Sequence, residues 1–224
     1  MRELEARYPC PVCLGVSMEK ARVGAQGGLL LDHCRRCGGV WFDAGELLRL
    51  RQQGAASFWK AVTPRSDLFR MQCHSCQSFI DRNEASCASC GWANRLDCPL
   101  CQKQMDRATH QGLVLDSCRS CKGVWFDHHE LASIWSLELD TSLRKRGGQL
   151  RGVAADGSGA LLEVLAFNPW LAYGAADAAG HLLAGSADML AHAPEGAAFV
   201  VEAAGEAASG VFDTIVGIIS DMFS

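Results

Sequence analysis

The spacing of the cysteines is the strongest constraint on this chain of 224 residues. All twelve cysteines fall into six Cys-x-x-Cys pairs, and none is left over. A two-residue spacer lets both thiolates of one turn bind the same ion at about 2.3 Å, so two pairs complete a tetrahedral shell around Zn²⁺. Taken in sequence order, the pairs predict three four-cysteine zinc sites: Cys10, Cys13, Cys34 and Cys37; Cys73, Cys76, Cys87 and Cys90; and Cys98, Cys101, Cys118 and Cys121.

The cysteines could instead form a disulfide framework, or they could belong to a dithiol redox protein. The chain begins with charged residues rather than an apolar run, so we expect no signal peptide and a reducing, cytoplasmic location. A thioredoxin-like enzyme would need one such motif at the start of a helix in a βαβ unit. The gaps of 20, 10 and 16 residues between paired motifs suit zinc ribbons instead. His33 and His74 lie beside ligand cysteines and could substitute, but four cysteines per site make this unnecessary.

Charge is unevenly distributed along the chain. Residues 1–151 hold all 21 Lys and Arg and 16 of the 25 acidic residues, whereas residues 152–224 hold nine acidic residues and no Lys or Arg. Four thiolates around one Zn²⁺ carry a net charge of about −2, because the ligands must be deprotonated. Three loaded sites therefore cancel the basic surplus of the first region. This balance weakens a nucleic-acid-binding interpretation, which requires a basic patch.

The first and third sites lie in copies of one motif, over residues 10–50 and 98–134. Their shared core reads Gly-Leu-x-Leu-Asp-x-Cys-x-x-Cys-x-Gly-Val-Trp-Phe-Asp-x-x-Glu-Leu. The Leu-x-Leu stretch predicts a short strand before the second cysteine pair. Gly39 and Gly123 follow that pair, where a backbone with positive φ is often needed. The Trp-Phe dipeptide is predicted to cover the metal site.

The end of the repeated motif predicts a capped helix. Asp43 and Glu46 have the spacing of a capping box, as do Asp127 and Glu130, and apolar residues follow at helical spacing. The Trp-Phe-Asp-x-x-Glu run could instead be an exposed docking surface. We favour the folding role, because capping residues stand at capping spacing.

This pattern resembles the transcription-factor-IIB-type zinc-ribbon family, found largely in small bacterial proteins. The resemblance covers about a third of the chain, and it implies zinc binding by both copies. The family name implies transcription, but a shared fold does not establish a mechanism. The first copy has four more residues between its cysteine pairs, so we expect its loop to differ.

The predicted fold class is small, metal-stabilised α+β: three zinc-ribbon modules followed by a C-terminal α-helical hairpin region. The middle site lacks the Val-Trp-Phe-Asp element and is predicted to be a plain zinc ribbon. The predicted organisation is zinc ribbon 1 with its helix over 1–54, a linker over 55–70, zinc ribbon 2 over 71–95, zinc ribbon 3 with its helix over 96–140, a linker over 141–159, and an Ala/Gly-rich acidic helical region over 160–224.

The C-terminal region predicts two amphipathic helices, over about 169–192 and 195–223, each with an acidic stripe. The main interpretation is a hairpin that docks on the zinc ribbons or on another copy of the chain. One alternative is that this region binds a partner protein or a membrane interface. The other is a metal site between the helices, formed by Asp177, His181, Glu202 and Glu206. No uncharged run of 18 apolar residues is present, so we expect no transmembrane segment.

Closed four-cysteine shells favour a zinc-binding, non-enzymatic adaptor for protein–protein interaction, with a link to transcription machinery implied by the family. A catalytic zinc usually keeps an open coordination position, and these sites offer none. One alternative is a nucleic-acid-binding ribbon protein, supported by Arg35, Arg36, Arg119, Lys122 and the basic cluster at 144–146. The other is a thiol-redox-sensing, self-assembling or membrane-associated effector that acts through the helical tail.

Overall fold

The structure is a computed structural model. It describes residues 7–24, 28–46, 49, 58, 62, 70–110, 113–145, 210, 213–221 and 223. The predicted helix at 169–192, most of the helix after Asp43 and the alternative Asp177–Glu206 metal site lie outside these residues.

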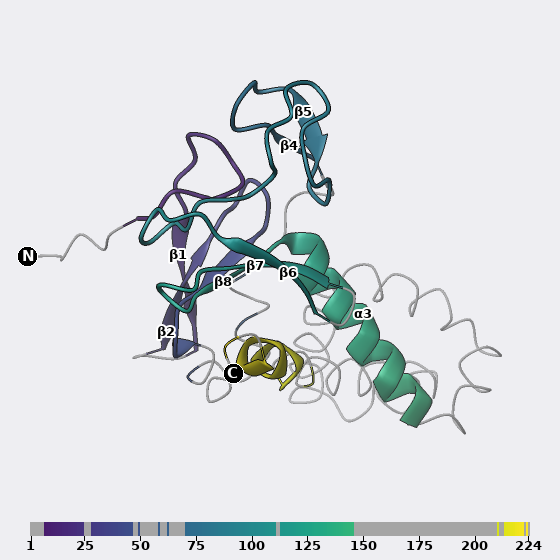
Figure 1. The fold of residues 1–224 in the computed structure, drawn as a ribbon. Coiled ribbons are helices and arrows are strands. Elements are labelled where there is room, and N and C mark those ends of the chain that lie inside the picture. The colour runs from purple at the N-terminus through teal and green to yellow at the C-terminus, as the bar shows by residue number, and fades with distance from the viewer. Residues whose placement is uncertain are drawn as a thin grey trace, which may run out of the picture.

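The first and third zinc ribbons form one six-stranded antiparallel sheet (Figure 1). The first ribbon contributes β1 (Glu19–Val23), β2 (Leu29–His33) and β3 (Val40–Phe42). The third contributes β6 (Asp106–His110), β7 (Leu113–Ser117) and β8 (Val124–Phe126). The strand order β1-β2-β3-β8-β7-β6 places the two copies edge to edge. The strands expected from the Leu-x-Leu stretches are β2 and β7, but the sequence pattern did not reveal that the two ribbons share a sheet.

The two ribbons meet where β3 pairs with β8. Trp41 lies opposite Trp125, with Val40 opposite Phe126 and Phe42 opposite Val124. Because both strands have the same Val-Trp-Phe sequence, the antiparallel pair is self-complementary. The strand residues are buried on both faces of the sheet. Strands buried on both sides are expected to be continuously apolar, as these two are.

Each tryptophan at this seam packs onto a glycine of the other ribbon. A Cβ placed on Gly39 would lie 2.1 Å from the Trp125 ring, and one on Gly123 would lie 2.2 Å from the Trp41 ring. Both indoles are fully buried. The glycine of the repeated motif therefore provides space for the partner ribbon's indole.

This arrangement corrects our expectation for Gly39 and Gly123, which do not have positive φ. The left-handed residue after the knuckle is instead the preceding one, Gly38 in the first ribbon and Lys122 in the third, with φ of 75° and 57°. The residue with positive φ therefore lies one position earlier in the chain than expected. The constraint on the motif glycine is steric.

Helix α3 (His128–Lys145) begins directly after Asp127. The Asp127 amide donates to Glu130 Oε2 at 2.8 Å, and the equivalent bond joins the Asp43 amide to Glu46 in the first ribbon. The predicted capping contact from Glu to the cap amide is therefore present in both copies. Helix α3 continues to Lys145, past the predicted start of the linker at residue 141.

The aspartate of each capping box also holds the seam tryptophan of its own ribbon. Trp41 Nε1 donates to Asp43 Oδ1 at 2.6 Å, and Trp125 Nε1 donates to Asp127 Oδ1 at 2.8 Å. A buried indole N–H needs such an acceptor. The Trp-Phe-Asp-x-x-Glu run thus connects the seam to the start of the helix.

The middle ribbon is the smallest module. Strands β4 (Arg70–Gln72) and β5 (Phe79–Asp81) form a separate two-stranded sheet, drawn at the top of Figure 1. At its contact with the first ribbon, the His74 imidazole lies 3.3 Å from the Val12 carbonyl oxygen. The same imidazole stacks on Trp92. His74 therefore positions the module.

A short helix over residues 213–221 lies near the end of the chain. Its buried residues are Ile215 and Ile218, and Thr214 donates a hydrogen bond to Glu138 on α3. Lys122 of the third ribbon lies over the Phe223 ring. This helix matches part of the second predicted helix, whereas the predicted hairpin is not tested because its first helix is outside the described residues. In the part of the chain that the structure describes, no helix is both long enough and apolar enough to span a membrane.

Replacing Gly39 or Gly123 by alanine should destabilise the zinc-loaded protein by about 1–3 kcal/mol, as overpacking does. The added methyl group would overlap the opposing indole ring. Urea denaturation followed by tryptophan fluorescence measures the change. Gly217→Ala is the control, because Gly217 lies in a helix with open space around its Cβ position. If Gly39→Ala were as stable as that control, the packing of indole on glycine would be wrong.

Candidate metal centres and the cleft between the ribbons

The structure brings the twelve cysteines together in three groups of four. The groups are Cys10, Cys13, Cys34 and Cys37; Cys73, Cys76, Cys87 and Cys90; and Cys98, Cys101, Cys118 and Cys121. Within each group all sulfur atoms lie within 4.8 Å of one another. These are the quartets expected from sequence order. No histidine joins any of the groups among the described residues.

The sulfur–sulfur distances fit a tetrahedral zinc ion. Four ligands at about 2.3 Å from the metal are about 3.8 Å apart in a regular tetrahedron. The sulfurs of Cys10 and Cys37 are 3.8 Å apart, and those of Cys101 and Cys118 are 3.6 Å apart. A disulfide bond requires about 2.05 Å, and all twelve thiols are free. Each quartet could therefore hold one zinc ion.

Electrostatics in the quartets also favours a bound cation. Burial raises the pKa of the Cys10 thiol, and it raises that of Cys98 to about 11. A hydrogen bond from Ser78 lowers the pKa of Cys87 to about 6, and the Lys103 backbone lowers that of Cys101 to about 7. Each quartet thus combines a thiol of lowered pKa (Cys13, Cys87 or Cys101) with one of raised pKa (Cys10, Cys90 or Cys98). A divalent cation supplies the charge that lets all four become thiolates.

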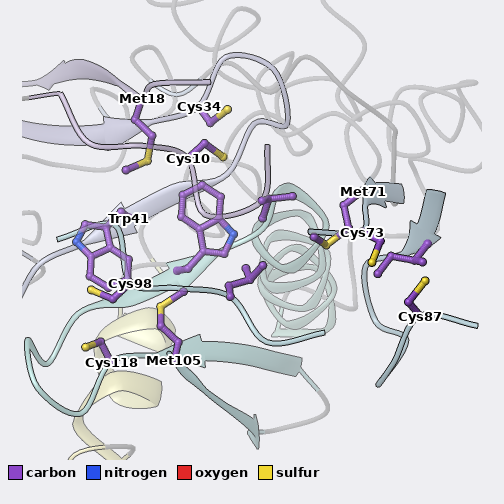
Figure 2. Packing of buried hydrophobic residues seen from close by; sticks show 14 residues of the cluster. Cys10, Met18, Cys34, Trp41, Met71, Cys73, Cys87, Cys98, Met105 and Cys118 are labelled. Carbon is purple, nitrogen blue, oxygen red and sulfur yellow. The ribbon is translucent and has the colours of Figure 1, made fainter. Parts of the chain in front are cut away.

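The first and third sites are better covered than the middle one. Their cysteines are all buried or half-buried. Buried cysteines of all three sites share an apolar cluster with Met18, Trp41, Met105 and Trp125 (Figure 2). In the middle site Cys76 and Cys90 are exposed. The seam tryptophans thus take part in covering the metal sites in addition to joining the two ribbons. The phenylalanines of the Trp-Phe dipeptides, which were also expected to cover the sites, lie outside that cluster, and Phe42 and Phe126 contact each other.

A buried arginine connects the middle ribbon to the third ribbon. Arg82 follows β5, is 3% exposed, and donates to the Asp116 carboxylate. Its Nε lies 2.7 Å from Asp127 Oδ2, on the residue that caps α3. Glu130 is buried beside them, and burial raises its pKa well above the ordinary value. One cation from the middle ribbon therefore neutralises a cluster of buried carboxylates in the third.

A second arginine makes the reverse contact. Arg107 of β6 donates to the backbone carbonyl groups of Arg82, Asn83, Glu84 and Asn94 in the middle ribbon. The side-chain amide of Asn94 donates to the carbonyls of Arg82 and Glu84 from within that ribbon. The turn after β5 is therefore held by donors from both modules.

In the first ribbon, the equivalent buried aspartate pairs with a cation of its own ribbon. Lys20 lies opposite Asp32 in the sheet, and its Nζ donates to Asp32 Oδ2 at 2.9 Å. Arg107 lies opposite Asp116 at the equivalent position of the third ribbon. There Arg107 turns to the middle ribbon and Arg82 takes its place on the aspartate. The duplicated ribbons have thus diverged where the middle module docks.

A cleft of about 330 Å³ lies where the three ribbons meet. Its apolar wall includes Leu14 and Phe79, which are 37% and 61% exposed. Arg36 and Arg70 line the same cleft, next to the start of α3. The Arg70 guanidinium lies over the Phe79 ring, 5.7 Å from its centre. This arrangement can bind an apolar side chain that is flanked by a carboxylate.

The residues that build the junction and the cleft were not found from the sequence. Arg82, Arg107 and Phe79 belong to no repeated motif, and their roles depend on how the modules pack. The recurring Asp of the Leu-x-Leu-Asp stretch is the sequence signal for these contacts. A buried carboxylate at a strand end requires a cation, and Lys20 and Arg82 supply it.

Two segments of the chain match one family model. The family is described as "Transcription factor zinc-finger", the TFIIB-type zinc ribbon, and the matches cover residues 9–53 and 97–136. They coincide with the first and third ribbons of the structure, whereas the middle quartet lies between them. No curated protein and no solved structure matches the chain. The two copies recognised in the sequence are therefore confirmed.

Replacing Arg82 by glutamine should lower the free energy of unfolding by about 3–5 kcal/mol, because buried carboxylates lose their cation. Urea denaturation of the zinc-loaded chain measures the loss. Arg95→Gln is the matched control, since Arg95 lies in the same ribbon and is exposed. Lys20→Gln should cost less than Arg82→Gln, because the Lys20 side chain is 21% exposed and that of Arg82 is 4%. Equal stability of the Arg82 and Arg95 variants would contradict the assigned role.

The stability of the first ribbon should depend on the ionisation of Glu46. Burial raises the pKa of Glu46 to about 7, with Asp43 and Asp32 nearby. The folded state then binds this proton more tightly than the unfolded state, so stability is lost as the pH rises from about 4.5 through 7. In Glu46→Gln this loss should disappear. The wild type should lose about 1–2 kcal/mol relative to the variant between pH 5 and 8, after allowing for solvent screening.

Urea denaturation of both proteins at matched zinc concentrations tests this prediction. Zinc loss at low pH affects both proteins and cancels in the difference. Glu84→Gln, at an exposed position, controls for the loss of one charge. If the difference in the free energy of unfolding between Glu46→Gln and wild type stayed constant with pH, Glu46 would have the same pKa in the folded and unfolded states.

Proposed function

We propose that this chain, whose first and third modules are TFIIB-type zinc ribbons, is a non-enzymatic zinc protein that binds other proteins. The observation that carries the proposal is the closed four-cysteine set at every site. Four thiolates complete the shell of a tetrahedral zinc ion and leave no position for a substrate or water. Zinc then stabilises the modules, and the function belongs to the surface that they build together.

The cleft at the junction of the ribbons is the surface best suited to a partner. Leu14 and Phe79 remain exposed there although the sheet nearby is well packed. Arg36 has no partner among the described residues, and Arg70, whose Nε lies 3.4 Å from Asp81 Oδ1, is more than half exposed. We infer that the partner presents an apolar side chain next to an acidic one. Aromatic and arginine side chains are typical of the residues that dominate such interfaces.

Nucleic acid is the second candidate ligand, and the paired charges count against it. Arg35 pairs with Glu19 and Arg119 pairs with Asp106, each at 2.7 Å. Lys122 lies over the Phe223 ring. These are three of the four cations that supported phosphate binding outside the cluster at 144–146; the fourth, Arg36, has no partner among the described residues and lines the cleft. The existing contacts of the first three favour a protein partner.

Transcription machinery is the first class of partner to test, because the matched family is described as a transcription-factor zinc finger. A ribbon of this type does not define a mechanism by itself. A cytoplasmic location is part of the proposal, since four-cysteine zinc sites need reduced thiols.

The test is an affinity capture from the native host with the immobilised, zinc-loaded full chain, read by mass spectrometry after nuclease treatment. We expect a defined protein to be retained by wild type and lost with Phe79→Ala or Leu14→Ser. Leu137→Ala is the matched control, because Leu137 is an exposed leucine outside the cleft. Zinc content and circular dichroism should be the same for all variants.

Two outcomes would contradict the proposal. If the captured protein binds equally well to Phe79→Ala, the cleft is not the docking surface. If nuclease treatment removes every specific protein, and the chain binds DNA with a steep salt dependence, the nucleic-acid function is favoured.

A further inference from the structure

The middle site differs from the other two in its exposure to solvent. In the first and third quartets the second cysteine of each pair is half-buried, whereas Cys76 and Cys90 are exposed. The middle ribbon has no Val-Trp-Phe strand, and Trp92, which stacks on His74, is only partly buried. Reactivity of a cysteine with oxidants follows its thiolate character and its exposure. Zinc ligands are thiolates at all three sites, so exposure decides between them.

We propose that the middle quartet is an oxidation-sensitive site that reacts with a hydroperoxide before either of the other two. The exposed thiolate of Cys76 or Cys90 attacks one peroxide oxygen, and the O–O bond breaks. This step forms a sulfenic acid and releases water or alcohol after proton uptake. A neighbouring thiolate then attacks the sulfenic sulfur, forms a disulfide and releases water. Two electrons from two thiolates thus reduce one hydroperoxide.

The geometry supplies a resolving thiol for each exposed one. The sulfurs of Cys76 and Cys87 are 3.7 Å apart, and those of Cys73 and Cys90 are 3.6 Å apart. One disulfide removes two of the four zinc ligands, so the ion is released. A second hydroperoxide can oxidise the remaining pair.

Loss of zinc at this site affects the third ribbon through Arg82. The middle ribbon contains only two three-residue strands, and modules of this size depend on the metal for folding. When it unfolds, Arg82 leaves the buried carboxylates of Asp116 and Asp127. Those groups then lack a cation at the start of α3, and uncompensated buried charge is strongly destabilising. Oxidation of an exposed site is thereby converted into loosening of α3.

The first experiment is a titration of the zinc-loaded full chain with hydrogen peroxide. A chromogenic chelator records zinc release, and differential alkylation with mass spectrometry records which thiols are lost. We expect the first zinc equivalent to leave as Cys73, Cys76, Cys87 and Cys90 become oxidised, at least about tenfold faster than the other eight cysteines. Dithiothreitol with added zinc should restore the starting state. Equal rates at the three quartets, or earlier loss of the first or third, would overturn the proposal.

The second experiment measures hydrogen exchange in residues 127–145 before and after that partial oxidation. We expect faster exchange at the start of α3 in the oxidised protein. Arg82→Gln should give the same increase without oxidant, and Arg95→Gln should not. If oxidation of the middle quartet leaves exchange in α3 unchanged, the coupling through Arg82 is wrong.

Discussion

The antiparallel pairing of β3 with β8 is the interaction on which the rest of this structure depends. It joins two ribbons, each too small for a core of its own, into one six-stranded sheet. Each indole at the seam fills the space above the other ribbon's glycine and donates to the capping-box aspartate of its own ribbon. Metal site, sheet and helix are therefore connected through one repeated stretch of the chain.

The middle ribbon breaks the symmetry of this pair. It contacts the first ribbon through His74 and inserts Arg82 among the carboxylates of the third. The equivalent carboxylate of the first ribbon is satisfied internally by Lys20. The asymmetry makes the third ribbon dependent on its neighbour, whereas the first has its own charge balance. The docked middle ribbon also forms one wall of the cleft between the three modules.

Short-range features of this chain could be predicted from its sequence. The quartets follow from Cys-x-x-Cys spacing, and the helix start at Asp127 follows from capping residues three positions apart. Contacts between modules could not be predicted, because a motif does not indicate which surface will cover it. Val-Trp-Phe suggested burial but not the partner strand. Arg82 has no distinctive neighbours in the sequence, and only the fold brings it to Asp116.

The identical edges of β3 and β8 have a consequence for how the chain is made. During synthesis, β3 emerges long before β8, because the whole middle ribbon lies between them. Until then the first ribbon presents an unpaired apolar strand, and that strand is self-complementary with the same strand of another nascent chain. Neighbouring ribosomes on one message could thus produce exchanged dimers through β3. The high local concentration of β8 within the same chain favours the closed monomeric pairing once synthesis is complete.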